Sequence, residues 1–299
     1  MTRLRKGDAS RGGSDPQEVG PTAHHTHIGS GHRLLDLNLG ELWRYRDLVW
    51  LLTRRSFVVT YKQTILGPLW LLLSPLLTSL AYVVLFGNIA RLSTDGAPQL
   101  LFYLLGTAAW TYFSTCVTTN ATTFIDNAHL FGKVWFPRLA VPVSRVLGAL
   151  IHLGIQMLLV LVLVACYTAT GAIRPHWALW PTVPVVLALL GALGMGCGIL
   201  ISSLTTRYRD LNVLVGFGVS LWMYVTPVVY PLDGVSESLR WAILANPASA
   251  PMECLRSAIL GTGGVSATHM AYAAVVSVAV LFWGMVVFTK VERTFMDTI

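Results

Sequence analysis

The sequence predicts an all-α protein that crosses a membrane several times, and three observations support this fold class. Of its 299 residues, 54% are hydrophobic and only 12% are charged, whereas a typical soluble domain carries about 25% charged residues. Six long apolar segments follow one another, and roughly 20 such residues cross a bilayer as a helix. Lysine and arginine gather in alternate connections between these segments, as in polytopic membrane proteins. We therefore expect a polytopic bundle of six transmembrane helices.

The first element is a polar tail. Residues 1–37 are rich in glycine, serine, proline and histidine. They contain too few apolar side chains to offset the entropy lost on ordering, so we expect a disordered cytoplasmic tail. The four histidines between positions 24 and 32 have no cysteine, aspartate or glutamate among them to complete a metal site. No metal site is predicted.

Residues 38–60 form the first predicted helix. Trp43, Trp50 and Phe57 recur every seven residues, which returns them to nearly the same helix face. This amphipathic pattern predicts an N-terminal helix that lies along the membrane interface. Packing of the same face against a cytoplasmic protein is the alternative, and the sequence does not separate the two.

The chain enters the membrane at the run YKQTILGPLW, residues 61–70. Lys62 supplies interfacial charge, and Trp70 lies at the boundary between lipid and water that tryptophan favours. Pro68 suits the first turn of a helix, where its missing N–H costs no hydrogen bond. The first transmembrane helix is therefore expected to begin at residue 68.

None of the six expected spans contains an aspartate or a glutamate. Arg145 and His152, both in the third span, are the nearest ionisable groups. Ion-coupled carriers generally need acidic residues or broken helices within the membrane, so the sequence disfavours a secondary transporter. The predicted spans are 68–89, 100–122, 143–170, 183–204, 213–230 and 270–288.

The distribution of positive charge predicts the orientation. Seventeen of the 21 lysines and arginines lie before the first span or in later segments on the same side of the membrane. The opposite side holds only Arg91, Arg174, Arg240 and Arg256. Because cytoplasmic segments hold the excess, both termini are expected in the cytoplasm. The net charge of +7 then reflects topology and attraction to anionic membrane lipids, and no nucleic-acid binding is predicted.

Two spans have patterned small or polar residues. Hydroxyl side chains recur along the second span at steps of three or four residues and form one stripe, which either lines a path for a polar substrate or packs against another helix. The stripe consists of Thr107, Thr111, Ser114 or Thr115, Thr118 and Thr122. In the fourth span, Gly191, Gly194 and Gly198 form a small face that predicts close helix packing.

The connection at 125–140 mixes aromatic and basic side chains on the cytoplasmic side, and we expect a short helix in it. Trp135, Phe136 and Arg138 lie close together, and aromatic residues beside arginine are typical of protein-contact hot spots. An aromatic anchor at the membrane interface is the alternative.

The last outer connection, 231–262, contains two short half-apolar pieces at 236–245 and 249–260, separated by Asn246-Pro247. Neither piece approaches the roughly 20 residues of a membrane span. We expect re-entrant half-helices here, with a small outer cap as the alternative.

Nucleotide-binding and catalytic motifs do not occur in the sequence. A phosphate-binding P-loop ends in Gly-Lys-Ser or Gly-Lys-Thr, whereas here Gly132-Lys133 is followed by Val134. If ATP powers the protein, another chain binds it. No pair of histidine or acidic residues has a spacing that suggests joint catalysis, so no enzyme is predicted.

Five short motifs stand in the order found in one group of transporters. They are YKQTILGPLW at 61–70, KVWFPR at 133–138, RYRDL at 207–211, TPVVY at 226–230, and Asn246-Pro247 with Arg256. In this combination the chain resembles the membrane (permease) subunits of ABC polysaccharide exporters of the O-antigen, teichoic acid and cell-wall galactan type. The resemblance covers residues 38–299.

The resemblance implies an assembly and a substrate. The permease would form a homodimer joined to two copies of a separate ATPase, which would bind ATP and magnesium, and no cofactor is expected in this chain. The exported substrate would be a lipid-linked polysaccharide carried on polyprenyl diphosphate, and the membrane would be the bacterial cytoplasmic (inner) membrane. Export of a small hydrophobic drug or lipid by an ABC transporter is the alternative function.

The resemblance also implies roles for residues. The N-terminal helix and the cytoplasmic loop would contact the ATPase through Trp43, Trp50, His129, Leu130, Lys133, Trp135, Phe136 and Arg138. The last outer connection would act as a gate, with Arg240, Trp241, Asn246, Pro247, Glu253 and Arg256.

Side-chain chemistry suggests which residues line the path. Sugars offer hydroxyls and weakly apolar ring faces, so a path for them is expected to use aromatic and hydroxyl side chains and to avoid fixed charge. The candidates are Tyr82, Thr107, Trp110, Thr111, Tyr112, Phe113, Thr118, Trp222, Tyr224 and Tyr230.

Overall fold

The computed structural model describes residues 39–62, 66–131, 136–205 and 210–296, which contain helices and no strand. They belong to one compact unit, Leu34–Ile299. The tail predicted at 1–37 lies outside the described residues. The helices are α1 (Leu39–Arg44), α2 (Arg46–Tyr61), α3 (Trp70–Tyr82, continued by a π-helical stretch at Val83–Ile89), α4 (Gln99–Ala121), α5 (Thr123–Phe131), α6 (Ala140–Ala169), α7 (Val183–Thr205), α8 (Leu211–Val225), α9 (Glu237–Ala245), α10 (Ser249–Leu260) and α11 (Ala267–Met296).

Five helices of the described part are long and apolar enough to cross a membrane. They are Trp70–Ile89, Gln99–Ala121, Ala140–Ala169, Trp177–Thr205 and Ala267–Val291. Helix α11 continues beyond residue 288, where the last predicted span ends. The sequence of its last turns contains the charged residues Lys290, Glu292 and Arg293. Helix α8 is apolar but has only 15 residues.

Helix α8 is shorter than the fifth predicted span, 213–230. Helix α8 stops at Val225, and Thr226 has the extended backbone angles φ −102° and ψ 141°. Pro227 explains this boundary, because proline disfavours helical angles in the residue before it. The segment from Thr226 to Tyr230 is therefore non-helical.

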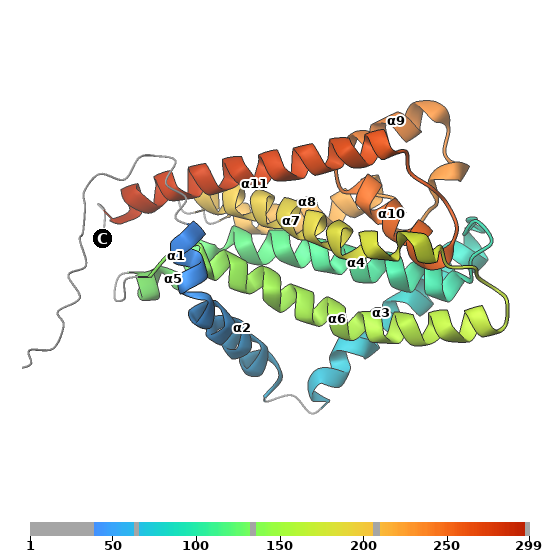
Figure 1. Cartoon of the computed structure of the whole chain (residues 1–299), viewed down its shortest axis with the longest axis horizontal. Helices are drawn as coiled ribbons and strands as arrows, with labels where there is room; N and C mark the ends of the chain where they lie inside the picture. Colours follow the sequence, from blue (N-terminus) through green and yellow to red (C-terminus); the bar gives the residue numbers. More distant parts are fainter. Residues whose placement is uncertain (1–38, 63–65, 132–135, 206–209, 297–299) are drawn as a thin grey trace, which may run out of the picture. The chain divides into compact units, whose positions relative to one another are not determined.

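Helix α4 is the centre of the bundle. It packs against α3, α6, α7, α8 and α10, and most of its side chains are buried. Figure 1 shows α4 and α7 running side by side between α6 and α11.

The glycines of α7 allow this close packing. A Cβ atom added at Gly194 would lie 2.7 Å from the Cβ of Cys116, and one at Gly198 would lie 2.5 Å from the Cβ of Asn120. Both neighbours belong to α4, so the predicted packing role of these glycines is confirmed. On another face of α7, a Cβ at Gly196 would lie 2.7 Å from the backbone nitrogen of Leu281 in α11.

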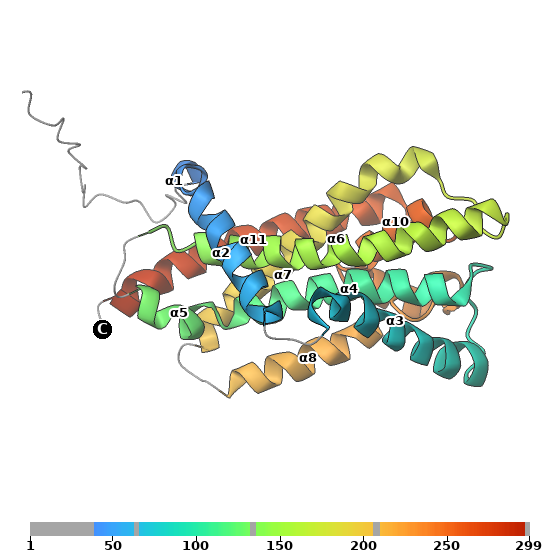
Figure 2. The same ribbon diagram turned by 90° about the horizontal axis from the view of Figure 1, so that it is seen from below.

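Helices α3 and α8 lie at the edge of the bundle. In α8 only Val219 is buried, and apolar side chains such as Phe217 and Leu221 are exposed. In α3 the buried residues are Leu71, Pro75 and Ser79. Figure 2 shows both helices along one side of α4. These two helices therefore leave wide apolar faces without a partner in the described part of the chain.

Helix α2 packs on α6 near one end of the bundle. Its Val49 and Thr53 are buried, and the Thr53 hydroxyl donates to the backbone carbonyl of Ser144 at 3.2 Å. A turn at Tyr45 separates α2 from α1. Figure 1 shows α1, α5 and the last turns of α11 at this end, with α9 and α10 at the opposite end.

Candidate functional site

A buried ion pair connects α10 to the segment that follows α8. The Arg256 guanidinium donates to the Glu253 carboxylate at 2.8 Å, and only 3% and 1% of the two side chains is exposed. The same guanidinium donates to the carbonyls of Pro227 at 2.7 Å and Val228 at 3.3 Å. Its central carbon lies 4.0 Å from the centroid of the Phe102 ring in α4. Arg256 thus satisfies backbone carbonyls that have no helical partner.

Burial determines the ionisation of Glu253. Removal from water raises the pKa of this carboxyl above its ordinary value, and the positive charge of Arg256 acts in the opposite direction. The negative charges of Asp95 and Asp233 raise the pKa further. Charged Glu253 therefore depends on Arg256 as its partner.

Asn246 connects the corner between α9 and α10 to the last turn of α8. Its side-chain oxygen accepts hydrogen bonds from the Trp222 indole at 3.1 Å and from the backbone N–H of Ala248 at 3.1 Å. Its amide nitrogen donates to the Thr226 hydroxyl at 2.8 Å. Three of the four hydrogen-bonding positions of this amide are thus used. Asn246 thus joins the corner between these two helices to the last turn of α8.

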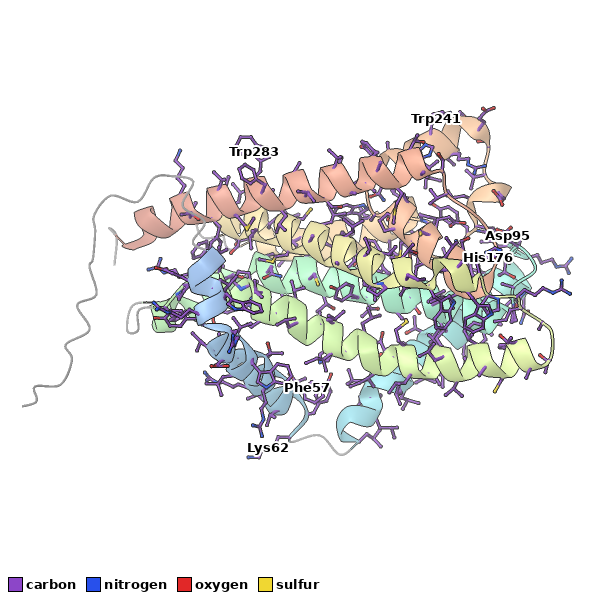
Figure 3. The ribbon with its side chains drawn as sticks, viewed as in Figure 1. Phe57, Lys62, Asp95, His176, Trp241 and Trp283 are labelled. Carbon is purple, nitrogen blue, oxygen red and sulfur yellow. The ribbon has the colours of Figure 1, made fainter. Side chains whose placement is uncertain are left out.

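The other predicted gate residues lie at the edge of this cluster. Arg240 approaches Asp233 at 3.6 Å, and both side chains are largely exposed. Trp241 is exposed and lies beside the ring of His269, with 5.7 Å between centroids. Figure 3 shows Trp241 on the outer surface of the bundle.

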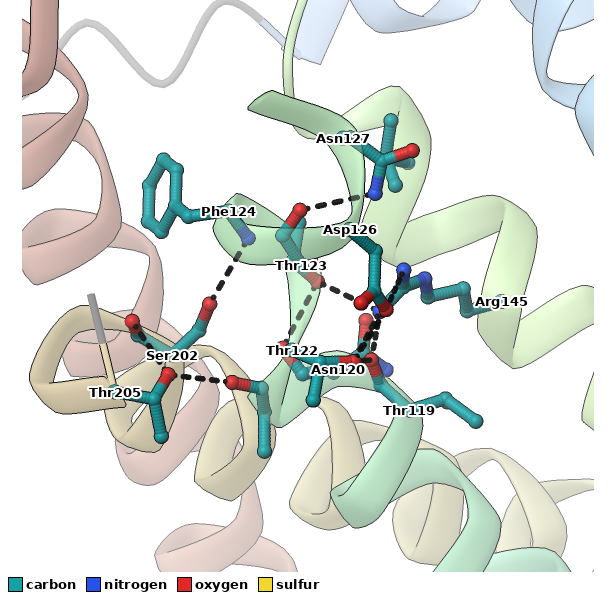
Figure 4. Close-up of polar contacts among 12 residues, drawn as sticks. Thr119, Asn120, Thr122, Thr123, Phe124, Asp126, Asn127, Arg145, Ser202 and Thr205 are labelled. Carbon is teal, nitrogen blue, oxygen red and sulfur yellow. Dashed lines mark hydrogen bonds and ion pairs between the residues drawn. The ribbon is translucent and has the colours of Figure 1, made fainter. Parts of the chain in front are cut away.

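A second polar cluster holds α5 against three other helices (Figure 4). Arg145 of α6 donates to the carbonyl of Thr119 and, at 2.9 Å, to the carboxylate of Asp126 in α5. The Thr122 hydroxyl donates to the same carboxylate at 2.6 Å. The backbone N–H of Phe124 donates to the Ser202 hydroxyl of α7 at 3.4 Å. Arg145 therefore determines how α5 is held at the end of the bundle.

Sequence reasoning missed this role of Arg145, which it treated only as an ionisable group within the third span and as one of the positive charges that assign the orientation. The signal was present, because an arginine within an apolar segment marks a functional or structural site and needs a polar partner. Asp126 is that partner.

The predicted path residues are divided between the core and the surface. Trp110, Tyr112, Phe113 and Thr107 are buried, and Thr111 and Tyr224 are exposed. Rings of three candidates meet, since Phe113 lies 5.3 Å from Trp110 and 5.1 Å from Trp222 between centroids. The remaining candidates, Tyr82, Thr118 and Tyr230, are half-buried. Their role in a path stays a prediction.

The predicted ATPase-contact residues also differ in exposure. Trp43 is 72% exposed and Trp50 is exposed as well, whereas Arg138 is buried and Phe136 packs against the cluster around Phe124 and Phe288. His129 and Leu130 belong to α5, but their side chains are not among the parts of the chain that the structure describes. Lys133 and Trp135 lie outside the described residues.

Metal ligands do not gather in the described ranges, where no three histidine, cysteine, aspartate or glutamate side chains are grouped. The histidines of the tail lie outside these ranges.

Comparison with known proteins identifies the family. Residues 47–260 match the family of ABC-2 type transporters. The chain belongs to this family. The permease is similar to two proteins named O-antigen export system permease protein RfbA. The protein from Klebsiella pneumoniae is 26% identical over 260 residues, which is 87% of this permease and 96% of the relative. The protein from Myxococcus xanthus is 30% identical over 263 residues, or 87% and 98% of the two chains. The resemblance drawn from the five motifs is therefore confirmed.

Proposed function

We propose that this permease is the transmembrane subunit of an ATP-driven exporter that moves a lipid-linked polysaccharide across the bacterial cytoplasmic membrane. The observation that carries the proposal is its similarity, over nearly the whole length of both relatives, to O-antigen export permeases. The lipid carrier is polyprenyl diphosphate, and this chain acts in transport and not as an enzyme.

The assembly contains two copies of the permease and two copies of a separate ATPase, which binds ATP and magnesium. This arrangement is supported by the missing P-loop, since Gly132-Lys133 is followed by Val134. The contact with the ATPase involves α1, α2 and the connection after α5. The exposed indoles of Trp43 and Trp50 support this assignment, because large exposed aromatic residues are typical of protein contacts.

The permease crosses the membrane six times, with both termini in the cytoplasm. Helix α8 is the fifth span although its 15 residues rise only about 22 Å. The non-helical segment from Thr226 to Tyr230 supplies the rest of the crossing. Non-helical backbone is tolerated at membrane depth where protein satisfies its polar groups, and Arg256 does so for two of its carbonyls.

Helices α9 and α10 act as re-entrant half-helices that close the outer end of the path. Asn246 and Arg256 hold both to the end of α8, so a shift of α8 moves the closure with it. The path itself uses neutral aromatic and hydroxyl side chains, because these pack against sugar rings and form hydrogen bonds with sugar hydroxyls.

Depletion of the permease in its own host tests the proposal. The expected result is accumulation of lipid-linked polysaccharide on the inner face of the cytoplasmic membrane, and a plasmid copy of the permease should reverse it. The sugar composition of the accumulated polymer identifies the substrate. A normal distribution of glycans, together with ATP hydrolysis stimulated by small hydrophobic compounds, would contradict glycan export and support export of a small hydrophobic molecule.

A further inference from the structure

A small polar cavity lies between α3, α4 and α6, on the side of the bundle where α2 ends and α3 begins. Its volume is about 270 Å³. Helix α4 contributes Thr107, Thr111 and Thr115, which are four residues apart and so lie on one face. Helix α6 contributes His152 and Gln156, again four residues apart. Two polar helix faces thus meet in an otherwise apolar bundle.

Gln156 indicates that the cavity holds a polar group. Only 6% of this residue is exposed, yet its side-chain amide has no hydrogen-bond partner among the described residues. An amide offers two donors and two acceptor positions, and those of Gln156 face the open cavity, where a polar molecule can use them. The molecule that occupies the cavity is therefore expected to donate and accept hydrogen bonds.

The lining also indicates what charge the occupant carries. None of the residues around the cavity is a lysine, arginine, aspartate or glutamate. A phosphate or ammonium group would lose its hydration here without gaining an opposite charge, which is costly in a medium of low dielectric constant. A neutral ligand with several hydroxyl groups fits the lining.

The volume of the cavity and the aromatic side chains at its border limit which ligand can bind. The cavity has room for about nine waters at roughly 30 Å³ each, and it is smaller than the roughly 300–1,000 Å³ of typical drug-sized sites. Trp70 and Tyr61 also border it, and aromatic faces pack well against the C–H faces of sugar rings. One sugar ring fits, and an oligosaccharide does not.

The cavity opens towards the surroundings of the bundle. Ser74 and Thr78 of α3 border it and are exposed. Tyr61 stands at the end of α2, and its ring lies 5.7 Å from that of His152. Figure 3 shows the neighbouring Phe57 in the last turns of α2 and Lys62 just after this helix. A headgroup is thus able to enter sideways from the membrane.

We propose that the cavity between α3, α4 and α6 binds the single neutral sugar ring of a membrane glycolipid. Two lipids carry this chemistry, a bulk glycosyl diacylglycerol and a sugar linked to polyprenyl phosphate. Only the second source rests on the proposed function, since it is a form of the exported substrate.

The experiment uses the full-length permease, purified without its ATPase and placed in phosphatidylcholine nanodiscs. Three sets of nanodiscs contain increasing fractions of monoglucosyl diacylglycerol, polyprenyl phosphoglucose or phosphatidylglycerol, and Tm is measured for each. A ligand that binds only the folded protein raises Tm as its concentration rises. We expect at least one glucosyl lipid to raise Tm and phosphatidylglycerol to have no effect, and the lipid that acts identifies the source.

Two variants and a matched control connect the effect to the cavity. Gln156→Leu removes the buried amide and should weaken the apparent affinity about tenfold or more. Ser74→Trp fills the exposed entrance without changing the core and should abolish the shift. Ser203→Ala, on α7 and outside the cavity, should behave as wild type. A Tm shift that survives Ser74→Trp, an equal shift with phosphatidylglycerol, or no shift with either glucosyl lipid would overturn the proposal. None of these results depends on export, which the depletion experiment measures separately.

Discussion

Single residues hold the two polar clusters of this permease, and Arg256 shows how one side chain organises its surroundings. It pairs with Glu253, is almost completely shielded from solvent, and donates hydrogen bonds to two carbonyls of the segment that follows α8. A buried ion pair is weak evidence for stability, but removal of one partner is strongly destabilising, because the other remains buried and charged. A substitution of Arg256 therefore tests how the end of the bundle that contains α9 and α10 is stabilised.

Replacing Arg256 with methionine is expected to lower the free energy of unfolding by about 3–5 kcal/mol. Glu253 and the carbonyl of Pro227 would lose their buried partner. The measurement is denaturant unfolding of the purified permease in detergent. Arg240→Met is the control, because the Arg240 and Asp233 side chains are 40% and 57% exposed and such pairs contribute at most about 1 kcal/mol. Equal losses in the two variants would contradict the assignment.

The Arg256→Met variant should also respond to pH. Without the guanidinium, burial and the charges of Asp95 and Asp233 raise the pKa of Glu253, and only the smaller effect of Arg240 opposes them. A carboxyl with a raised pKa in the folded protein contributes stability that is complete below its unfolded pKa and is lost as pH rises through its folded pKa. The deficit against wild type should therefore be larger at about pH 8 than at about pH 5. Adding Glu253→Gln should remove this pH dependence, and a deficit that is the same at both values would refute it.

At the scale of elements, most helices could be predicted from the sequence, because apolar length and charge placement decide them. The short pieces around Asn246-Pro247 became α9 and α10, and Pro68 lies in a 3-10 turn, Gly67–Leu69, just before α3. The end of α8 could have been predicted from Pro227, but the apolar run through Tyr230 concealed it. Hydropathy measures composition and does not register where the backbone stops being helical.

The clusters between elements were less predictable. Arg145 and Asp126 are nineteen positions apart and meet only because α4 and α6 pack side by side. The same is true of the cavity, where the hydroxyl stripe of α4 could be seen in the sequence but its facing residue Gln156 could not. Pairings across helices depend on rotation about each helix axis, which one sequence does not specify.

The close packing of the α7 glycines against α4 predicts that a larger side chain there destabilises the permease. Gly198→Leu is expected to destabilise the permease by about 3 kcal/mol or more, since even a Cβ atom there would lie 2.7 Å from the backbone oxygen of Val117. Gly148→Leu in α6 is the matched control, because a Cβ atom at Gly148 meets nothing within 4 Å. Tm and the yield of inserted protein are the measurements. A Gly198→Leu protein with the Tm of the control would show that α4 and α7 separate easily.

Arg145 supports a prediction about how α5 is coupled to the bundle. Arg145→Met should reduce coupled ATP hydrolysis in the reconstituted exporter roughly fivefold or more, with normal insertion, because α5 loses its bond to α6. Arg145→Lys should recover only part of the activity, since lysine lacks the forked geometry of the guanidinium. Arg174→Met, at an exposed residue in the connection between α6 and α7, is the control. Full activity of Arg145→Met would show that α5 is held by other contacts.

At the scale of the whole molecule, the exposed faces of α3 and α8 suggest where a second copy of the permease packs. Phe217→Cys in α8 should form a disulfide with Leu77→Cys in α3 of a second copy, in a background with Cys166→Ser. Both positions are exposed within one copy, and so is Leu158 in α6, the control for lipid-facing positions. Gel mobility under non-reducing conditions measures the crosslink. Crosslinking at Leu158→Cys, and none between α3 and α8, would place the contact on another face.

The glycines of α7 have a mechanical consequence. Gly194 and Gly198 bring the α7 backbone against α4, and Gly196 faces Leu281 and Gly284 of α11. Where two helix backbones are in contact, no long side chains lie between them that could change rotamer. The two helices therefore cannot easily slide past each other. We therefore expect α4, α7 and α11 to move as one rigid body during transport. The helices that move against this core are expected to be α8, which is held at its end through Asn246 and Arg256, and α5, which is held through Arg145 and Phe124.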